Sequence, residues 1–97
     1  MPSYIALAKF TDQGIRSVKQ TVSRADAARE MGTRFGVRMQ EIYWTQGQYD
    51  LVTVLEATDE AAISAFSLAV ASAGNVKFET QRAFQRDEMA AILKKLP

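Results

Sequence analysis

Aromatic and acidic side chains gather around one predicted turn of the chain. Tyr43, Trp44, Tyr49 and Asp50 lie close together in the sequence, on either side of Gly47. Large rings with a few polar groups are typical of a pocket that holds a flat organic ligand. In such a pocket Asp50 is a candidate general base, and Tyr49 or Tyr43 is a candidate proton donor. These residues therefore define a candidate ligand-binding site.

Three residues from the ends of the chain are candidates for the same site. Arg82 follows Phe78 on one face of the last predicted strand, where its guanidinium would neutralise a bound anion. Tyr4 and Phe10 lie on one face of the first predicted strand. They belong either to a core between two sheets or to the wall of the pocket.

The residues at the turn also have a structural interpretation. An aspartate directly after a hairpin turn often accepts hydrogen bonds from backbone N–H groups, and Asp50 has that position. Gly47 is suited to supply the positive φ of the hairpin. Tyr43 and Trp44 are equally suited to a core or a subunit interface, because aromatic side chains anchor interfaces. Both interpretations stay open at this point.

The composition excludes several kinds of chemistry. The 97 residues include no cysteine and no histidine. Disulfides, thiolate nucleophiles, Ser-His-Asp triads and histidine metal sites are therefore absent. Adjacent acidic residues occur at predicted helix starts, where they favour the helix dipole, so we expect no metal and no cofactor.

The charge and hydropathy of the chain exclude two classes of partner. The formal net charge is only +1, whereas nucleic-acid binding requires clustered basic residues. No apolar run approaches the roughly 18 residues of a membrane span, and no signal peptide is evident. We therefore expect neither nucleic acid nor membrane as a partner, and a cytoplasmic location.

The hydrophobic pattern predicts four strands, two long helices and a short C-terminal helix. The strands are predicted at residues 3–10, 37–45, 50–56 and 76–82. The long helices are predicted from a capping box at Ser23–Asp26 to Gly36, and from an N-cap at Thr58 to Gly74. The C-terminal helix is predicted at residues 87–96, with four apolar side chains facing inward: Met89, Ile92, Leu93 and Leu96.

This order of elements indicates a fold of the α+β class. Strand, helix, strand, strand, helix, strand is the ferredoxin-like βαββαβ arrangement, with a four-stranded antiparallel sheet and two helices on one face. The length fits a single domain over residues 1–97.

The other face of that sheet requires a cover. The predicted strands at 3–10 and 50–56 are apolar on both faces, and monomers avoid large exposed apolar patches. We expect a second copy of the chain to cover this face, sheet against sheet, in a homodimer or an assembly of homodimers. The alternative is that the C-terminal helix folds over it.

Several motifs resemble those of the GYD domain family, over nearly the whole chain. The stretch from Tyr43 to Asp50 resembles its signature, with Gly47, Tyr49 and Asp50 as the residues of the name. Similar motifs are Phe10-Thr11-Asp12-Gln13-Gly14-Ile15, Gly74-Asn75-Val76 and Thr80-Gln81-Arg82-Ala83-Phe84.

The resemblance implies a fold and leaves the function open. It implies a dimeric α/β barrel, in which two ferredoxin-like sheets pack together. Proteins of that architecture include cofactor-independent monooxygenases and isomerases, as well as proteins without known activity, so fold does not define function. We expect a homodimer that binds a small ligand or a protein partner. The alternative is a cofactor-independent enzyme for a small aromatic or carbonyl compound, with Asp50 as base and Tyr49 or Tyr43 as proton donor.

Overall fold

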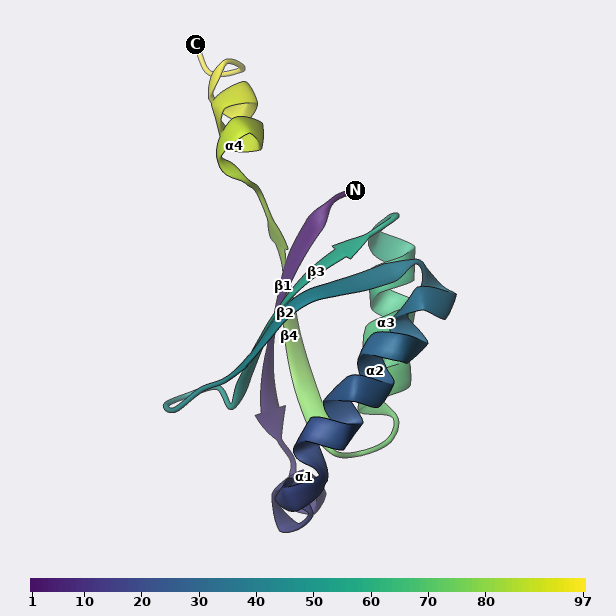
Figure 1. Ribbon diagram of the computed structural model, residues 1–97. Coiled ribbons are helices and arrows are strands. Elements are labelled where there is room, and N and C mark those ends of the chain that lie inside the picture. Colours follow the sequence, from purple (N-terminus) through teal and green to yellow (C-terminus); the bar gives the residue numbers. More distant parts are fainter.

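The computed structural model describes all 97 residues and contains one antiparallel sheet with the strand order β2-β3-β1-β4 (Figure 1). This order confirms the ferredoxin-like fold of the α+β class. The strands are β1 (Ser3–Phe10), β2 (Val37–Trp44), β3 (Leu51–Ala57) and β4 (Val76–Ala83).

Both long helices lie against the same face of the sheet (Figure 1). The helices are α1 (Asp12–Arg16), the 3-10 helix η1 (Val18–Gln20), α2 (Thr21–Phe35), α3 (Glu60–Ala71) and α4 (Arg86–Leu93). We call the face under α2 and α3 the helix face, and the opposite face the open face.

The hydrophobic core lies between the helix face and the two long helices. Tyr4 and Leu55 from the central strands pack against Ile63 and Phe66 of α3. The Phe66 ring meets the Phe35 ring of α2 edge to face, with 6.2 Å between the ring centroids. Only 13 of the 97 residues are buried, which is a small core for one chain. Additional burial against a partner would therefore stabilise the fold.

Local signals explain where most helices begin and end. Thr11 caps α1 by accepting a hydrogen bond from the Gly14 N–H at 3.0 Å. Gly36 ends α2 with a left-handed conformation at φ 74°, as predicted. The predicted cap at Thr58 is wrong by one residue, because the Asp59 carboxylate accepts from the Ala62 N–H at 2.8 Å.

The predicted capping box at Ser23–Asp26 is wrong. α2 begins at Thr21, because η1 leads directly into it and Gln20 takes the N-cap position. Ser23 therefore lies inside the helix, where its hydroxyl donates to the Gln20 carbonyl at 2.9 Å. Serine side chains often bond to the preceding turn in this way.

A β-bulge in β2 sets which side chains reach each face. Met39 pairs with Leu55 and Glu41 pairs with Val54, so Gln40 is the extra residue. This extra residue interrupts the alternation of side chains between the two faces along β2. Beyond the bulge Tyr43 lies on the open face.

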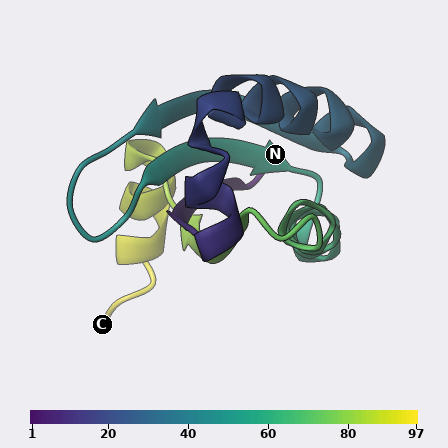
Figure 2. The same ribbon diagram turned by 90° about the horizontal axis from the view of Figure 1, so that it is seen from below.

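The C-terminal helix projects away from the rest of the chain (Figure 1). Seen from below, α4 also stands apart from α2 and α3 (Figure 2). The prediction that its apolar residues face inward is wrong for Met89, Leu93 and Leu96, which are 42%, 55% and 64% exposed. The helix continues outward from the end of β4, so the chain measures 51 × 31 × 17 Å. The alternative in which this helix covers the open face is therefore excluded within one chain.

We predict that Gly14→Ala lowers the free energy of unfolding by about 1–3 kcal/mol. A Cβ at position 14 would lie 1.9 Å from the Asn75 carbonyl oxygen, which is a backbone atom and cannot rotate away as a side chain could. Helix propensity alone predicts the opposite sign, a gain of about 1 kcal/mol. Urea unfolding followed by circular dichroism measures the difference.

The control for this substitution is Arg16→Ala, at an exposed position of the same helix. It should change the free energy of unfolding by less than about 0.5 kcal/mol. A Gly14→Ala variant as stable as the wild type would contradict the close packing of α1 on the loop before β4.

Candidate functional site

The aromatic residues of the predicted site lie on opposite faces of the sheet. Tyr43 lies on the open face, is 55% exposed, and its hydroxyl is 3.5 Å from the Glu41 carboxylate. Trp44 lies on the helix side, where its indole N–H donates to the Thr21 hydroxyl at 3.1 Å. The two rings are neighbours in the sequence, but alternation along β2 separates them.

Tyr49 crosses the open face and bonds to the far edge strand. Its hydroxyl donates to the Glu79 carboxylate of β4 at 2.5 Å, and the Lys9 ammonium lies 5.5 Å from the ring centroid. This hydrogen bond raises the pKa of the Tyr49 phenol, and desolvation and the charge of Glu79 raise it further. Tyr49 therefore keeps its proton at neutral pH and acts as a hydrogen-bond donor.

Asp50 is bonded to the backbone of a neighbouring strand. Its carboxylate accepts from the Phe10 N–H at 2.9 Å, and its own N–H donates to the Ala8 carbonyl at 2.8 Å. Its carbonyl accepts from the Thr45 N–H at 2.8 Å, across the base of the hairpin. These three bonds tie the end of β1 to the β2–β3 hairpin. The partner of the carboxylate is thus on β1 rather than in the turn itself.

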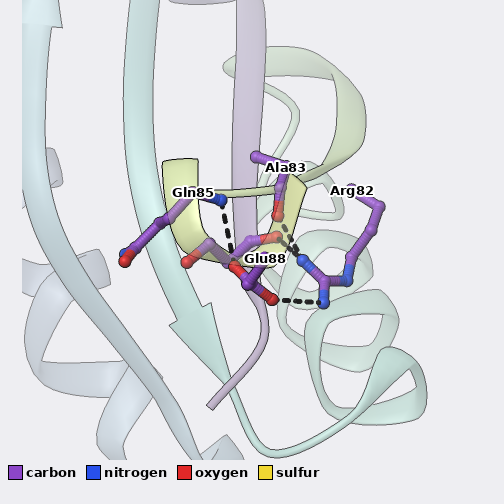
Figure 3. A network of polar contacts seen from close by, with 5 residues as sticks. Arg82, Ala83, Gln85 and Glu88 are labelled. Carbon is purple, nitrogen blue, oxygen red and sulfur yellow. Dashed lines mark hydrogen bonds and ion pairs between the residues drawn. The ribbon is translucent and has the colours of Figure 1, made fainter. Parts of the chain in front are cut away.

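Arg82 forms a polar network where β4 leads into α4 (Figure 3). Its guanidinium donates to the Ser3 carbonyl at 3.1 Å and to the Ala83 carbonyl, and lies 3.4 Å from the Glu88 carboxylate. Glu88 also accepts from the Gln85 N–H at 3.0 Å in the capping box of α4. The Gln85 N–H, and then Arg82, lower the pKa of the Glu88 carboxyl against the opposing effect of burial.

Aromatic rings complete the surroundings of Arg82. The guanidinium carbon lies 4.5 Å from the ring centroid of Phe84 and 5.7 Å from that of Tyr4. Tyr4 is buried in the core on the helix face. Arg82 already has a carboxylate partner in Glu88, so it positions α4 relative to the sheet.

The structure thus distributes the predicted site residues over three places. Tyr43 and Tyr49 share the open face, Arg82 and Tyr4 lie at the root of α4, and the remaining three lie near the hairpin and the end of β1: Trp44, Asp50 and Phe10. Their assignment as one ligand site stays a prediction.

The open face, on which Tyr43 and Tyr49 lie, has an apolar centre and a charged border. Its centre is apolar, because Ile5 pairs with Val54 and Leu7 pairs with Val52 across the two central strands. Six charged residues surround this centre, three basic and three acidic: Lys9, Arg38, Lys77, Glu41, Glu56 and Glu79. Glu79 is the residue that the sequence did not single out. Its outward position follows from the alternation in β4.

Two further features bear on possible ligands. No group of three or more Asp, Glu, His or Cys side chains lies close enough together to hold a metal ion. None of the helices combines the length and the apolar character that crossing a membrane requires.

Comparison with known proteins gave three results. Residues 4–93 match the GYD domain. A protein of Thermus thermophilus described as "Glutamine synthetase and cystathionine beta-lyase binding protein" is 36% identical over 95 residues, which cover 97% of this chain and 100% of the relative. The crystal structure of TTHA0845, also from Thermus thermophilus, superposes with a TM-score of 0.57 at 22% identity, covering 88% of this chain and 95% of that one.

We predict that Asp50→Ala lowers the free energy of unfolding by about 1–3 kcal/mol, because the Phe10 N–H loses its partner. Asp50→Asn should cost less, since an amide oxygen can still accept this bond. Chemical denaturation of both variants measures the difference. Equal stability of Asp50→Ala and the wild type would contradict the structural role of Asp50 and would favour the alternative role of its carboxylate as a general base.

We also predict that Glu79→Gln lowers the pKa of Tyr49. The raised pKa means that the folded chain holds this proton more tightly than the unfolded chain. The Tyr49–Glu79 hydrogen bond therefore stabilises the fold at pH values below the ordinary tyrosine pKa of about 10. This contribution to stability is lost as the pH rises through the raised pKa of Tyr49. NMR titration of the tyrosine rings measures the shift. Glu41→Gln is the control and should leave the titration of Tyr49 unchanged.

Proposed function

Since the chain belongs to the GYD domain family, we propose that it is a protein-binding accessory subunit that acts as a homodimer. The observation that carries this proposal is the full-length similarity to a relative described as binding two enzymes. The 36% identity extends over nearly all of both chains, so the similarity is not limited to an isolated motif.

The open face supports the homodimer. Four apolar residues in its centre would lose their contact with water against a second copy: Ile5, Leu7, Val52 and Val54. The charged residues around them are balanced, and each edge strand carries both signs, as with Lys77 and Glu79 on β4. A two-fold axis can therefore bring unlike charges together, which makes the face complementary to itself.

The size of the sheet also fits this assembly. Strands of 8 residues span about 27 Å, and four strands are about 19 Å wide. A stable dimer buries about 800 Å² on each subunit, which a side-chain-covered face of this extent can supply. One helix of about 12 Å could not cover it.

The C-terminal helix supports contact with a different protein. Met89 and Leu93 lie on one side of α4 and are 42% and 55% exposed. The pair of Arg82 with Glu88 and the capping box hold this helix at a defined angle. A fixed, exposed apolar helix suits docking into a groove of a larger enzyme.

An enzymatic role has less support. A base at position 50 would need a free carboxylate, whereas Asp50 is bonded to the backbone of β1. Tyr43 and Tyr49 lie on the face assigned to the second copy.

We predict that the chain binds the glutamine synthetase or the cystathionine beta-lyase of its own organism, with a Kd of about 10 µM or tighter. Biolayer interferometry on the purified immobilised enzymes measures this. The double variant Met89→Ser/Leu93→Ser should bind about tenfold more weakly, because it removes the apolar side of α4.

The matched control is Ala90→Ser/Ala91→Ser, two exposed positions on the same helix. It carries the same number of new hydroxyl groups and should bind like the wild type. Absence of binding to both enzymes would contradict the proposed partners. Equal binding by the Met89/Leu93 variant and its control would contradict the role of α4.

A further inference from the structure

A cavity of about 310 Å³ lies between the helix face of the sheet and helices α2 and α3. The cavity is partly open to solvent, because two of its lining residues, Ala27 and Ala73, are exposed. Ligand pockets in proteins occupy about 300–1,000 Å³, so this cavity lies at the small end of that range. It is separate from the open face and from the root of α4.

Short side chains on three sides leave this space empty. Alanines of the central strand β1, of α2, of α3 and of the turn after α3 line the cavity: Ala6, Ala8, Ala25, Ala28, Ala69 and Ala73. Longer side chains fill the neighbouring part of the same layer, where Phe66 of α3 packs edge to face with Phe35 of α2. The alanines therefore leave a hollow between larger core residues that also line it, such as Leu55 and Phe66.

The cavity has one polar end. Arg24 and Asn75 are among its lining residues, and both lie against Gly14. The Arg24 guanidinium donates to the Gly14 carbonyl at 3.3 Å, and the Asn75 carbonyl blocks any side chain at position 14. Thr21, one turn before Arg24 on α2, also lines the cavity and accepts from the Trp44 indole. Trp44 therefore stands beside the polar end.

Arg24 is a half-buried cation without an acidic partner. Its three hydrogen bonds go to the Ser17 carbonyl at 3.0 Å, the Ser17 hydroxyl at 2.9 Å and the Gly14 carbonyl. None of the ion pairs in the structure includes it. A guanidinium carries five N–H groups, so two of them remain for another acceptor. A carboxylate is the acceptor whose geometry matches them best.

We propose that this cavity binds an aromatic monocarboxylate, with its anionic group at Arg24 and its rings among the alanines. A cavity of about 150 Å³ in another protein holds benzene, so about twice that volume suits a two-ring body. The apolar lining favours such a body, and the single unpaired guanidinium favours one negative charge. This site is independent of the proposed binding of enzyme partners.

The test titrates the full-length chain with 2-naphthoate and, for comparison, with the neutral 2-naphthalenemethanol. The emission of Trp44, the only tryptophan, and isothermal titration calorimetry report binding. We expect one saturable site per chain for 2-naphthoate, with a Kd below about 1 mM. The wild type should bind the neutral compound more weakly.

Two pairs of variants locate the ligand. Ala69→Leu fills the cavity and should weaken 2-naphthoate binding at least about tenfold without lowering the melting temperature. The control is Ala65→Leu, at an exposed position of the same helix, which should leave 2-naphthoate binding unchanged. If Ala69→Leu does not fold, Ala28→Leu on α2 is the second cavity-filling variant. Arg24→Gln should weaken 2-naphthoate binding about tenfold but 2-naphthalenemethanol binding much less. Arg29→Gln, exposed on α2, should change neither.

Three outcomes would overturn the proposal. One is the absence of saturable 2-naphthoate binding, and another is binding that is unchanged in both cavity-filling variants. The third is binding that Val52→Lys abolishes and Ala69→Leu preserves, which would place the ligand on the open face. None of these outcomes affects the binding of the chain to glutamine synthetase, which is measured separately.

Discussion

The coverage of a four-stranded sheet is the constraint on which the rest of this structure depends. Two helices shield one face of the sheet, and the other face presents Ile5, Leu7, Val52 and Val54 to water. The chain buries only 13 of its residues, so its own core provides modest stability. The C-terminal helix points away from this face and, at about 12 Å, is too short to cover it. The second copy that we propose would remove this apolar surface from water.

Most residues suited to chemistry are used in this fold to join elements. Asp50 ties the hairpin to β1, Tyr49 bridges the open face to Glu79, and Arg82 fixes the direction of α4. Like Asp50, Arg24 is a charged residue bonded only to neutral groups, but it is the one of these residues that lines the cavity. Its place in the lining of the cavity thus separates Arg24 from the structural residues.

The sequence was sufficient to predict the fold and many of the residues at which helices and strands begin and end. The bounds of β1, the left-handed Gly36 and the order of the strands are confirmed, because each depends on local periodicity or on a glycine with positive φ. The predicted start of α2 at Ser23 is wrong, because the 3-10 helix η1 leads directly into α2 and Gln20 takes the N-cap position. Sequence alternation also cannot locate a bulge, and the one at Gln40 decides which face Tyr43 reaches.

The direction of α4 and the presence of the cavity could not be predicted from the sequence, for a different reason. An amphipathic pattern shows that a helix has an apolar side, but it does not show whether that side meets its own chain or another. The cavity appears only when α2 and α3 are placed on the same face of the sheet, where Ala28 and Ala69 both line it.

Native mass spectrometry of the purified chain at micromolar concentration tests the central claim most directly. Each chain has a mass of 10.8 kDa, and we expect the assembly to contain an even number of chains. Val52→Lys, which places a charge in the centre of the open face, should yield a folded monomer. Val22→Lys, at an exposed valine on α2, should keep the wild-type assembly. A wild-type monomer, or an assembly that Val52→Lys leaves intact, would contradict the covering of the open face by a second copy.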